Sequence, residues 1–349
     1  MTNAQSRLGN SLTPPDPGWL AKVSEPALER ELPIVDPHHH LWERGDMIYM
    51  YRDLLEDLQA GHNVVATVFV DCRSMYRKEG PPEMAPLGEV EFVNGIAAMS
   101  ASGGYGPCRV AEAIVGHAEL TQGARVREVL EAEIAVAGGR FRGIRHGVAW
   151  DGSDEVGRFV SRFIPPHQAR DPRFREGFAQ LAPLGLSFES WQYHPQLGDA
   201  IDLARAFPET AIILDHVGGV LGVGPYRGRR QELFAGWKKD IAELAGCLNV
   251  TVKLGGLGMT SFGFDFPERE TPPSSEDLAA AWRPYIETCI EAFGAERSMF
   301  ESNFPPDKQS CGYTELWNAF KRITEGASAA EKKALYSGTA ARVYRLTAP

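Results

Sequence analysis

Short runs of β-branched and aliphatic residues alternate along the chain with longer segments in which apolar residues recur at helical spacing. In residues 231–245, for example, Phe234, Trp237, Ile241 and Leu244 share one face of a helix. The short runs predict strands at residues 34–37, 64–71, 111–116, 141–148, 186–191, 211–216, 248–254 and 298–302. The longer segments predict helices at residues 47–60, 88–101, 122–137, 174–181, 197–207, 231–245, 275–292, 313–324 and 329–344.

The alternation of strands and helices extends over nearly the whole chain and indicates its fold class. Helices that cover both faces of a sheet predict parallel strands, and eight repeats can close into one (β/α)8 TIM barrel of the α/β class. An open doubly wound sheet is the competing architecture, but no GxGxxG follows the first predicted strand. Residues 1–31, which include Pro14, Pro15 and Pro17, are expected to form an N-terminal arm, and residues 32–349 the barrel.

The charge balance narrows the classes of partner. The 349 residues carry a formal net charge of -10, whereas binding to nucleic acid or to an anionic membrane needs a basic face. The five cysteines show no ligand or disulfide spacing, and the sequence shows neither a signal peptide nor a membrane-spanning apolar run. We therefore expect a cytoplasmic protein whose partner is a small-molecule substrate, with a homodimer as the default oligomeric state.

Three histidines are the strongest candidates for chemistry. In the first predicted strand, His38 and His40 share one face and His39 points the other way, because side chains alternate along a strand. His216 ends the predicted strand 211–216, and the Val-Gly-Gly turn that follows leaves its imidazole accessible to the same cavity. His38, His40 and His216 could hold one zinc ion with an open fourth position, or they could bind a substrate oxygen directly.

Six short motifs carry a resemblance to a known family. They are DPHHH at 36–40, IVGHAEL at 114–120, RGIRH at 142–146, LDHVGG at 214–219, VKLGGLG at 252–258 and MFESNFP at 299–305. In order and spacing they resemble the amidohydrolase superfamily, and most of all its branch of lactone hydrolases, over residues 32–346. The resemblance implies a TIM barrel in which these histidines and an aspartate after the last strand surround the reacting carbonyl. Many members of this branch work without a metal. Two possibilities therefore stay open: the site holds one divalent cation, with zinc as the first candidate, or it holds none.

The motif after the last strand departs from the family pattern. That pattern is close to GSDWP, whereas this chain has Glu301, Ser302 and Asn303 before Phe304 and Pro305. An amide cannot take a proton from water, so the usual general base is missing. Glu301, Asp307 or His216 could replace it, while Asn303 could orient the water or hydrogen-bond the carbonyl. Glu301 could instead form a structural ion pair with Lys253 on the neighbouring strand.

Other strand ends supply the substrate-binding candidates. Arg73 and Arg145 follow the second and fourth predicted strands, and their guanidinium groups suit carboxylates, although either could form a structural salt bridge instead. The full set of substrate-binding candidates is Arg73, Arg145, His146, Trp150, Glu189, Gln192, His194 and Lys253.

Three functional hypotheses follow from these residues and from the resemblance. The first is hydrolysis of a carboxylated or polyhydroxylated lactone, with the carbonyl polarised by His38, His40 and His216. The second is metal-dependent decarboxylation of an aromatic or unsaturated acid on the same barrel. The third is a non-catalytic barrel that binds a small acid, because Asn303 stands where an aspartate is usual.

Overall fold

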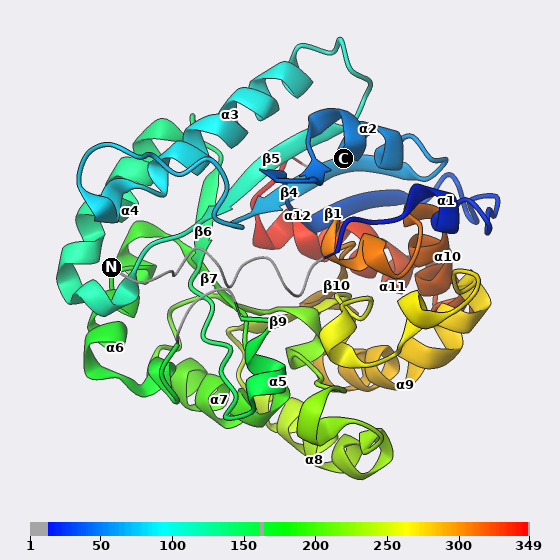
Figure 1. Cartoon of the computed structure of the whole chain (residues 1–349). Coiled ribbons are helices and arrows are strands. Elements are labelled where there is room, and N and C mark those ends of the chain that lie inside the picture. The colour runs from blue at the N-terminus through cyan, green and yellow to red at the C-terminus, as the bar shows by residue number, and fades with distance from the viewer. Residues whose placement is uncertain (1–12, 161–163, 348–349) are drawn as a thin grey trace.

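The computed structural model describes residues 13–160 and 164–347, and eight parallel strands form its central barrel (Figure 1). Each strand pairs with the next one along the chain, which is the order of a (β/α)8 barrel. The predicted fold is therefore confirmed. The barrel strands are β1 (Pro33–His39), β4 (Asn63–Val70), β5 (Arg109–Gly116), β6 (Phe141–Arg145), β7 (Ser187–Ser190), β8 (Ile212–Leu214), β9 (Val250–Leu254) and β10 (Ser298–Phe300).

The seam between the first and last barrel strands is held by backbone hydrogen bonds just beyond β10. The Asn303 amide donates to the His38 carbonyl at 2.9 Å, and the His40 amide donates to the Phe304 carbonyl at 2.8 Å. The closing contacts therefore involve residues of both the histidine-bearing and the asparagine-bearing motifs. These bonds fix the DPHHH motif against the MFESNFP motif.

Helices surround the barrel, and the apolar side chains between the two layers form the core (Figure 1). Phe300 of β10, for example, stacks on Phe320 of α10 with ring centroids 4.5 Å apart. No helix in the described parts of the chain is long and apolar enough to cross a membrane. The helices are α1 (Pro17–Leu20), α2 (Tyr51–Leu58), α3 (Leu87–Ala101), α4 (Val126–Val136), α5 (Asp154–Gly157), α6 (Pro172–Phe178), α7 (Leu197–Ala206), α8 (Arg230–Ala245), α9 (Ser275–Phe293), α10 (Tyr313–Ile323), α11 (Ala329–Lys333) and α12 (Thr339–Val343).

Three predicted helices differ from the structure. The helix predicted at 122–137 begins only at Val126, because residues 120–125 form a 3-10 segment in which Gly123 has a positive φ of 65°. The first turn of the predicted helix 47–60 is instead strand β3 (Met47–Tyr49), which pairs with β2 (Trp42–Arg44) in an antiparallel hairpin. Gly45 turns this hairpin with a positive φ of 63°. The predicted helix 329–344 is interrupted by a π-helical turn at Ala334–Gly338.

The sixth barrel strand is shorter than predicted. The sequence pattern places its end at His216, but β8 ends at Leu214 because His216 and Val217 both adopt positive φ, at 54° and 49°. The chain therefore turns sharply at the histidine. This turn places the imidazole at the mouth of the barrel rather than along the strand.

The described part of the N-terminal arm packs against the outer helices. The Glu25 carboxylate accepts hydrogen bonds from the Ser275 amide at 2.8 Å and from the Asn318 side chain at 3.0 Å. These contacts join the arm to the start of α9 and to the middle of α10. All five cysteines lie in the described residues, and each is a free thiol.

Candidate active site

One cavity of about 210 Å³ opens at the carboxyl ends of the barrel strands. The carboxyl ends of parallel strands meet at one rim, so residues far apart in the chain line the same wall. The lining side chains that matter for chemistry are His40, Arg44, Asp71, Arg73, His117, Arg145, Arg158, Trp191, Tyr193, His216 and Asn303.

The structure brings the three predicted histidines together. The ring of His38 lies 4.9 Å from that of His40 and 4.6 Å from that of His216, measured between centroids. His40 and His216 line the cavity, whereas His38 is fully buried directly beneath them. His39 points away, as predicted, and its Nε2 bonds to the Thr67 hydroxyl at 2.8 Å.

The Glu301 carboxylate contacts the rings of His216 and His38. Its Oε1 lies 2.6 Å from His216 Nδ1, and its Oε2 lies 2.8 Å from His38 Nδ1. A carboxylate only accepts hydrogen bonds, so His216 Nδ1 is assigned the proton. His38 Nδ1 also lies 3.2 Å from Lys253 Nζ, which only donates. The lone pair of His216 is then on Nε2, available to the cavity. His40 has the same tautomer, because its Nδ1 donates to the Val70 carbonyl at 2.8 Å.

Two consecutive glycines after β9 make room for this histidine–carboxylate contact. A Cβ atom on Gly255 would overlap the Glu301 side chain, and one on Gly256 would overlap the His216 ring. Gly256 also has a positive φ of 68°. The paired glycines of the VKLGG motif are thus a local requirement of the site.

Lys253 does not pair with Glu301, which corrects that alternative from the sequence. Its Nζ lies 2.7 Å from Glu189 Oε2 and 3.5 Å from Asp215 Oδ1, and all three groups are fully buried. The Tyr344 hydroxyl donates to the other Glu189 oxygen at 2.5 Å. Burial raises the pKa of Glu189 to about 8, against the opposing effect of Lys253. Burial lowers the pKa of Lys253, but the nearby carboxylates have the larger combined effect and raise this pKa.

Four arginines give the cavity wall a positive charge: Arg44, Arg73, Arg145 and Arg158. Asp71 is the one carboxylate among the described lining residues. Burial opposes its charge, but His117 and Arg145 outweigh burial and lower the pKa of Asp71. This arrangement favours an anionic ligand.

Asn303 lines the cavity with its backbone in the left-handed region, at a φ of 53°, which asparagine tolerates well. Its Nδ2 donates to Asp307 Oδ1 at 2.8 Å, so its Oδ1 is left to accept a hydrogen bond from the cavity. Asp307 itself is fully buried behind Asn303 and accepts from the Gly258 amide at 2.8 Å. Burial raises the pKa of Asp307 to about 7.

Six of the eight predicted substrate-binding residues are not on the cavity wall, and four of them, His146, Trp150, Gln192 and His194, follow β6 or β7. His146 Nδ1 accepts from the Leu120 amide, and His194 Nδ1 accepts from the Leu221 amide, each at 3.2 Å. Gln192 instead accepts from the Ser190 hydroxyl at 2.6 Å. Strands β6 and β7 end at Arg145 and Ser190, so strand alternation no longer orients the side chains that follow. Glu189 and Lys253 lie deeper, in the barrel interior.

Sequence patterns missed several residues of the wall. Arg44 lies in the β2–β3 hairpin, part of which the sequence pattern predicts as a helix. Arg158 follows the four-residue helix α5. His117 lies in the IVGHAEL motif, directly after β5. Its position at a strand end is the signal that could have identified it as a residue of the cavity wall.

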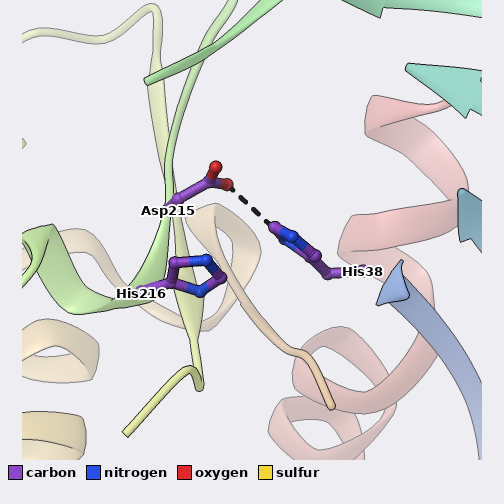
Figure 2. Close-up of side chains that lie close together, drawn as sticks. All are labelled: His38, Asp215 and His216. Atoms are coloured by element: carbon purple, nitrogen blue, oxygen red, sulfur yellow. Dashed lines mark ion pairs between the residues drawn. The ribbon is translucent and has the colours of Figure 1, made fainter. Parts of the chain in front are cut away.

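The described residues contain one His/Asp/His group with metal-like spacing, at His38, Asp215 and His216 (Figure 2). His40, which the sequence placed among the metal ligands, is not part of that group. The donor set suits zinc, but Lys253 Nζ lies 3.2 Å from His38 Nδ1 and 3.5 Å from Asp215 Oδ1. An ammonium group therefore faces two of the three ligand atoms. As arranged, these residues do not fit a metal ion.

A (β/α)8 barrel whose strand ends bring histidines, carboxylates and arginines into one cavity defines a barrel enzyme with acid–base chemistry. A family model described as Amidohydrolase matches residues 35–346. The chain belongs to the amidohydrolase family and is an enzyme of the hydrolase class. Membership in this family speaks against the non-catalytic alternative.

Two relatives match along nearly their whole length. The uncharacterized protein y4mH of Sinorhizobium fredii is 33% identical over 338 residues, which cover 90% of this chain and 99% of the relative. The L-fucono-1,5-lactonase of Burkholderia multivorans is 27% identical over 331 residues, covering 90% and 97%. The chain is thus similar to one protein named as a lactonase.

Solved structures share the fold. An amidohydrolase from Burkholderia multivorans with bound zinc has a TM-score of 0.68 and 23% identity, covering 90% of this chain and 99% of the other. A putative 2-pyrone-4,6-dicarboxylic acid hydrolase from Pseudomonas putida has a TM-score of 0.60 and 20% identity, covering 91% and 99%. A 5-carboxyvanillate decarboxylase from Sphingomonas paucimobilis has a TM-score of 0.51 and 12% identity, covering 90% and 100%.

Proposed function

We propose that this hydrolase opens the ring of a small carboxylated lactone, with His216 as the general base. The observation that carries the proposal is the hydrogen bond between His216 Nδ1 and Glu301, at 2.6 Å, at the wall of an arginine-rich cavity. The bond directs the proton to Nδ1 and leaves Nε2 basic toward the cavity. Glu301 then has the role of the orienting carboxylate, as in a catalytic dyad.

The reaction needs one proton acceptor and one cationic group for the developing oxyanion. His216 Nε2 takes a proton from water, whose oxygen attacks the lactone carbonyl, and Glu301 stabilises the imidazolium that results. Arg145, which lines the cavity, stabilises the negative charge on the carbonyl oxygen. The carbon–oxygen bond of the ring then breaks, and the imidazolium returns its proton to the leaving alkoxide.

His40 or Asn303 is suited to hold the attacking water, whose first hydrogen is directed at His216. The neutral His40 ring presents its Nε2 lone pair, and Asn303 presents its Oδ1, so either can accept the second hydrogen. His38 lies below the cavity and contacts Glu301 and Arg145. In this mechanism it is a positioning residue rather than a group that polarises the carbonyl.

The cavity wall supports a carboxylated substrate. Arg44, Arg73 and Arg158 add cationic groups beyond the reacting centre, and guanidinium groups bind carboxylates in a bidentate manner. Trp42 and Trp191 add apolar surface that suits a flat or partly apolar ring. The similarity to L-fucono-1,5-lactonase supports the lactone class, while the arginines favour an acid over a neutral sugar lactone.

Exchanging Arg73 for methionine should raise KM for a carboxylated lactone by about tenfold to a hundredfold, because a charge-assisted hydrogen bond is lost. The KM of a neutral lactone with the same ring should change by less than about threefold. Steady-state kinetics on the substrate pair measure this. Arg127→Met, which removes a surface arginine paired with Glu131 on α4, is the matched control. Equal KM changes for both lactones would remove Arg73 from carboxylate binding.

Exchanging Asn303 for aspartate should lower kcat by about tenfold or more rather than improve it. The new carboxyl would face Asp307 at hydrogen-bonding distance and lie near Glu301, and neighbouring carboxylates resist joint ionisation. A negative charge beside the reacting carbonyl would also oppose the oxyanion. Asn94→Asp on α3 adds the same charge away from the cavity and serves as the control. A more active N303D enzyme would show that the position needs a carboxylate.

A panel of lactones tests the function itself. Purified protein is mixed with carboxylated lactones, neutral sugar lactones and aromatic carboxylic acids, and acid release and CO2 release are followed separately. Acid release that is fastest with carboxylated lactones supports the proposal. CO2 release from an aromatic acid without lactone turnover would favour the decarboxylase hypothesis instead.

A further inference from the structure

We propose that the Lys253 ammonium group takes the place of a metal ion at the cluster of His38, Asp215 and His216. This cluster is the one group of described residues spaced like a metal site. In the proposal, the permanent cation of the site is part of the polypeptide, and Lys253 is a positioning residue that acts through His38 and Asp215. Only the activity measurements below rest on the proposed function.

The position of the ammonium nitrogen is the first observation. Lys253 Nζ lies 3.2 Å from His38 Nδ1 and 3.5 Å from Asp215 Oδ1, and these two atoms are 3.7 Å from each other. The three atoms thus form a compact triangle inside the barrel, and all three residues are fully buried. A metal bound by His38 and Asp215 would have to lie within a few ångströms of a second cation.

The hydrogen bonds of His38 are the second observation. Its Nδ1 lies 2.8 Å from Glu301 Oε2 and 3.2 Å from Lys253 Nζ, and its Nε2 faces Arg145 Nη1 at 3.2 Å. A zinc ligand needs a free lone pair on one ring nitrogen. In either tautomer of His38 a cationic donor faces the nitrogen that carries the lone pair, and removing Lys253 frees Nδ1.

The balance of buried charge is the third observation. Glu189 and Asp215 both lie within 3.5 Å of Lys253 Nζ, and Asp215 Oδ2 also lies 3.7 Å from Arg145 Nη1. Glu301 Oε1 is hydrogen-bonded to His216 Nδ1, and its Oε2 lies 2.8 Å from His38 Nδ1. Glu189 and Asp215 therefore each have a cationic side chain within 4 Å, although neither Asp215 oxygen has a hydrogen-bond partner. A divalent ion beside Asp215 would meet the ammonium group as well as the carboxylate.

Removing the ammonium should convert the cluster into a metal site. The variant K253M/E189Q removes the buried Lys253–Glu189 pair as a unit, and the amide oxygen introduced at position 189 can still accept from Tyr344. After incubation with zinc and desalting, we expect about one zinc ion per chain in the variant and less than about a tenth in the parent protein. Zinc should also raise the Tm of the variant and leave that of the parent unchanged.

Two controls keep the result specific. Adding D215N to the variant removes a ligand and should abolish the gained zinc. Lys321→Met removes another buried lysine that contacts a histidine, with Nζ 2.8 Å from His62 Nδ1, but no aspartate or second histidine of the cluster is near it. K321M should gain no zinc.

The zinc content of the parent protein tests the proposal even if the variant does not fold. A parent that holds one zinc ion per chain and loses lactone hydrolysis on chelation overturns the proposal, while leaving the lactonase function intact. A parent that takes up no zinc, with activity unchanged by a chelator, supports it. A folded variant that gains no zinc also overturns it. If no lactone is turned over, the zinc contents still give the answer and only the proposed function fails.

Discussion

Exchanging His216 for alanine should lower kcat for lactone hydrolysis by about three orders of magnitude, because general-base catalysis contributes roughly 10²- to 10⁴-fold. The ring lines the cavity, and Glu301 holds its Nδ1 at 2.6 Å. Alanine leaves no basic nitrogen at that wall, while the arginines that bind substrate stay in place. KM should therefore change much less than kcat, and the steady-state kinetics of the purified variant measure both.

A buried histidine elsewhere provides the control for this prediction. His62 packs against α10, with its Nδ1 2.8 Å from Lys321 Nζ and its Nε2 3.3 Å from the Thr314 carbonyl. His62→Ala should lower thermal stability but leave kcat within about twofold. Near-parental turnover in H216A, with the fold verified by circular dichroism, would exclude His216 as the base.

Exchanging Glu301 for glutamine should lower kcat by about 10²- to 10⁴-fold, although the side chain keeps its shape. A glutamine is neutral and has one acceptor oxygen and one donor nitrogen, so it cannot place a carboxylate oxygen against both His216 and His38. A donor placed at His216 Nδ1 would favour the tautomer with its proton on Nε2, which is not basic toward the cavity. The imidazolium would also lose its stabilising charge.

The control and the pH dependence make this prediction specific. Glu315→Gln changes another buried glutamate, on α10 outside the cavity, which accepts a hydrogen bond from the Glu25 amide at 3.1 Å. The amide substitute keeps an acceptor oxygen there, so kcat should stay within about twofold. An E301Q enzyme with unchanged kcat across the pH range would contradict the role of Glu301.

Much of the fold could be predicted from the sequence because its signals are local. Apolar runs located every barrel strand, and strand alternation put His38 and His40 together with His39 opposite. Ends of strands were less certain, as β8 shows, because the positive φ at His216 accompanies a close approach of its ring to Gly256, which is distant in the sequence. Helical spacing likewise concealed the β2–β3 hairpin.

The site was only partly readable for the same reason. His40, His216, Arg73, Arg145 and Asn303 lie at strand ends, where position along the chain predicts position in space. Arg44 and Arg158 reach the cavity from irregular segments, which sequence periodicity does not orient. The alternative that pairs Lys253 with Glu301 was wrong because neighbouring strands carry several carboxylates, and only the packed barrel selects among them.

The motif at 301–303 is the part of the site that departs from the family pattern. The family pattern has glycine and aspartate where this chain has Glu301 and Asn303. In the structure, the carboxylate two residues upstream reaches both His216 and His38, while the amide lines the cavity. In the proposed mechanism, Glu301 therefore takes the carboxylate role that an aspartate has in the family pattern, and Asn303 does not.

The seam between β1 and β10 has a consequence for how the protein matures. His38, His40 and Asn303 help to join the two ends of the cylinder through their own backbone atoms. A folding intermediate with an open cylinder therefore cannot possess a finished reaction centre. During refolding, turnover should appear together with the last cooperative step, which makes enzymatic rate a reporter of ring closure.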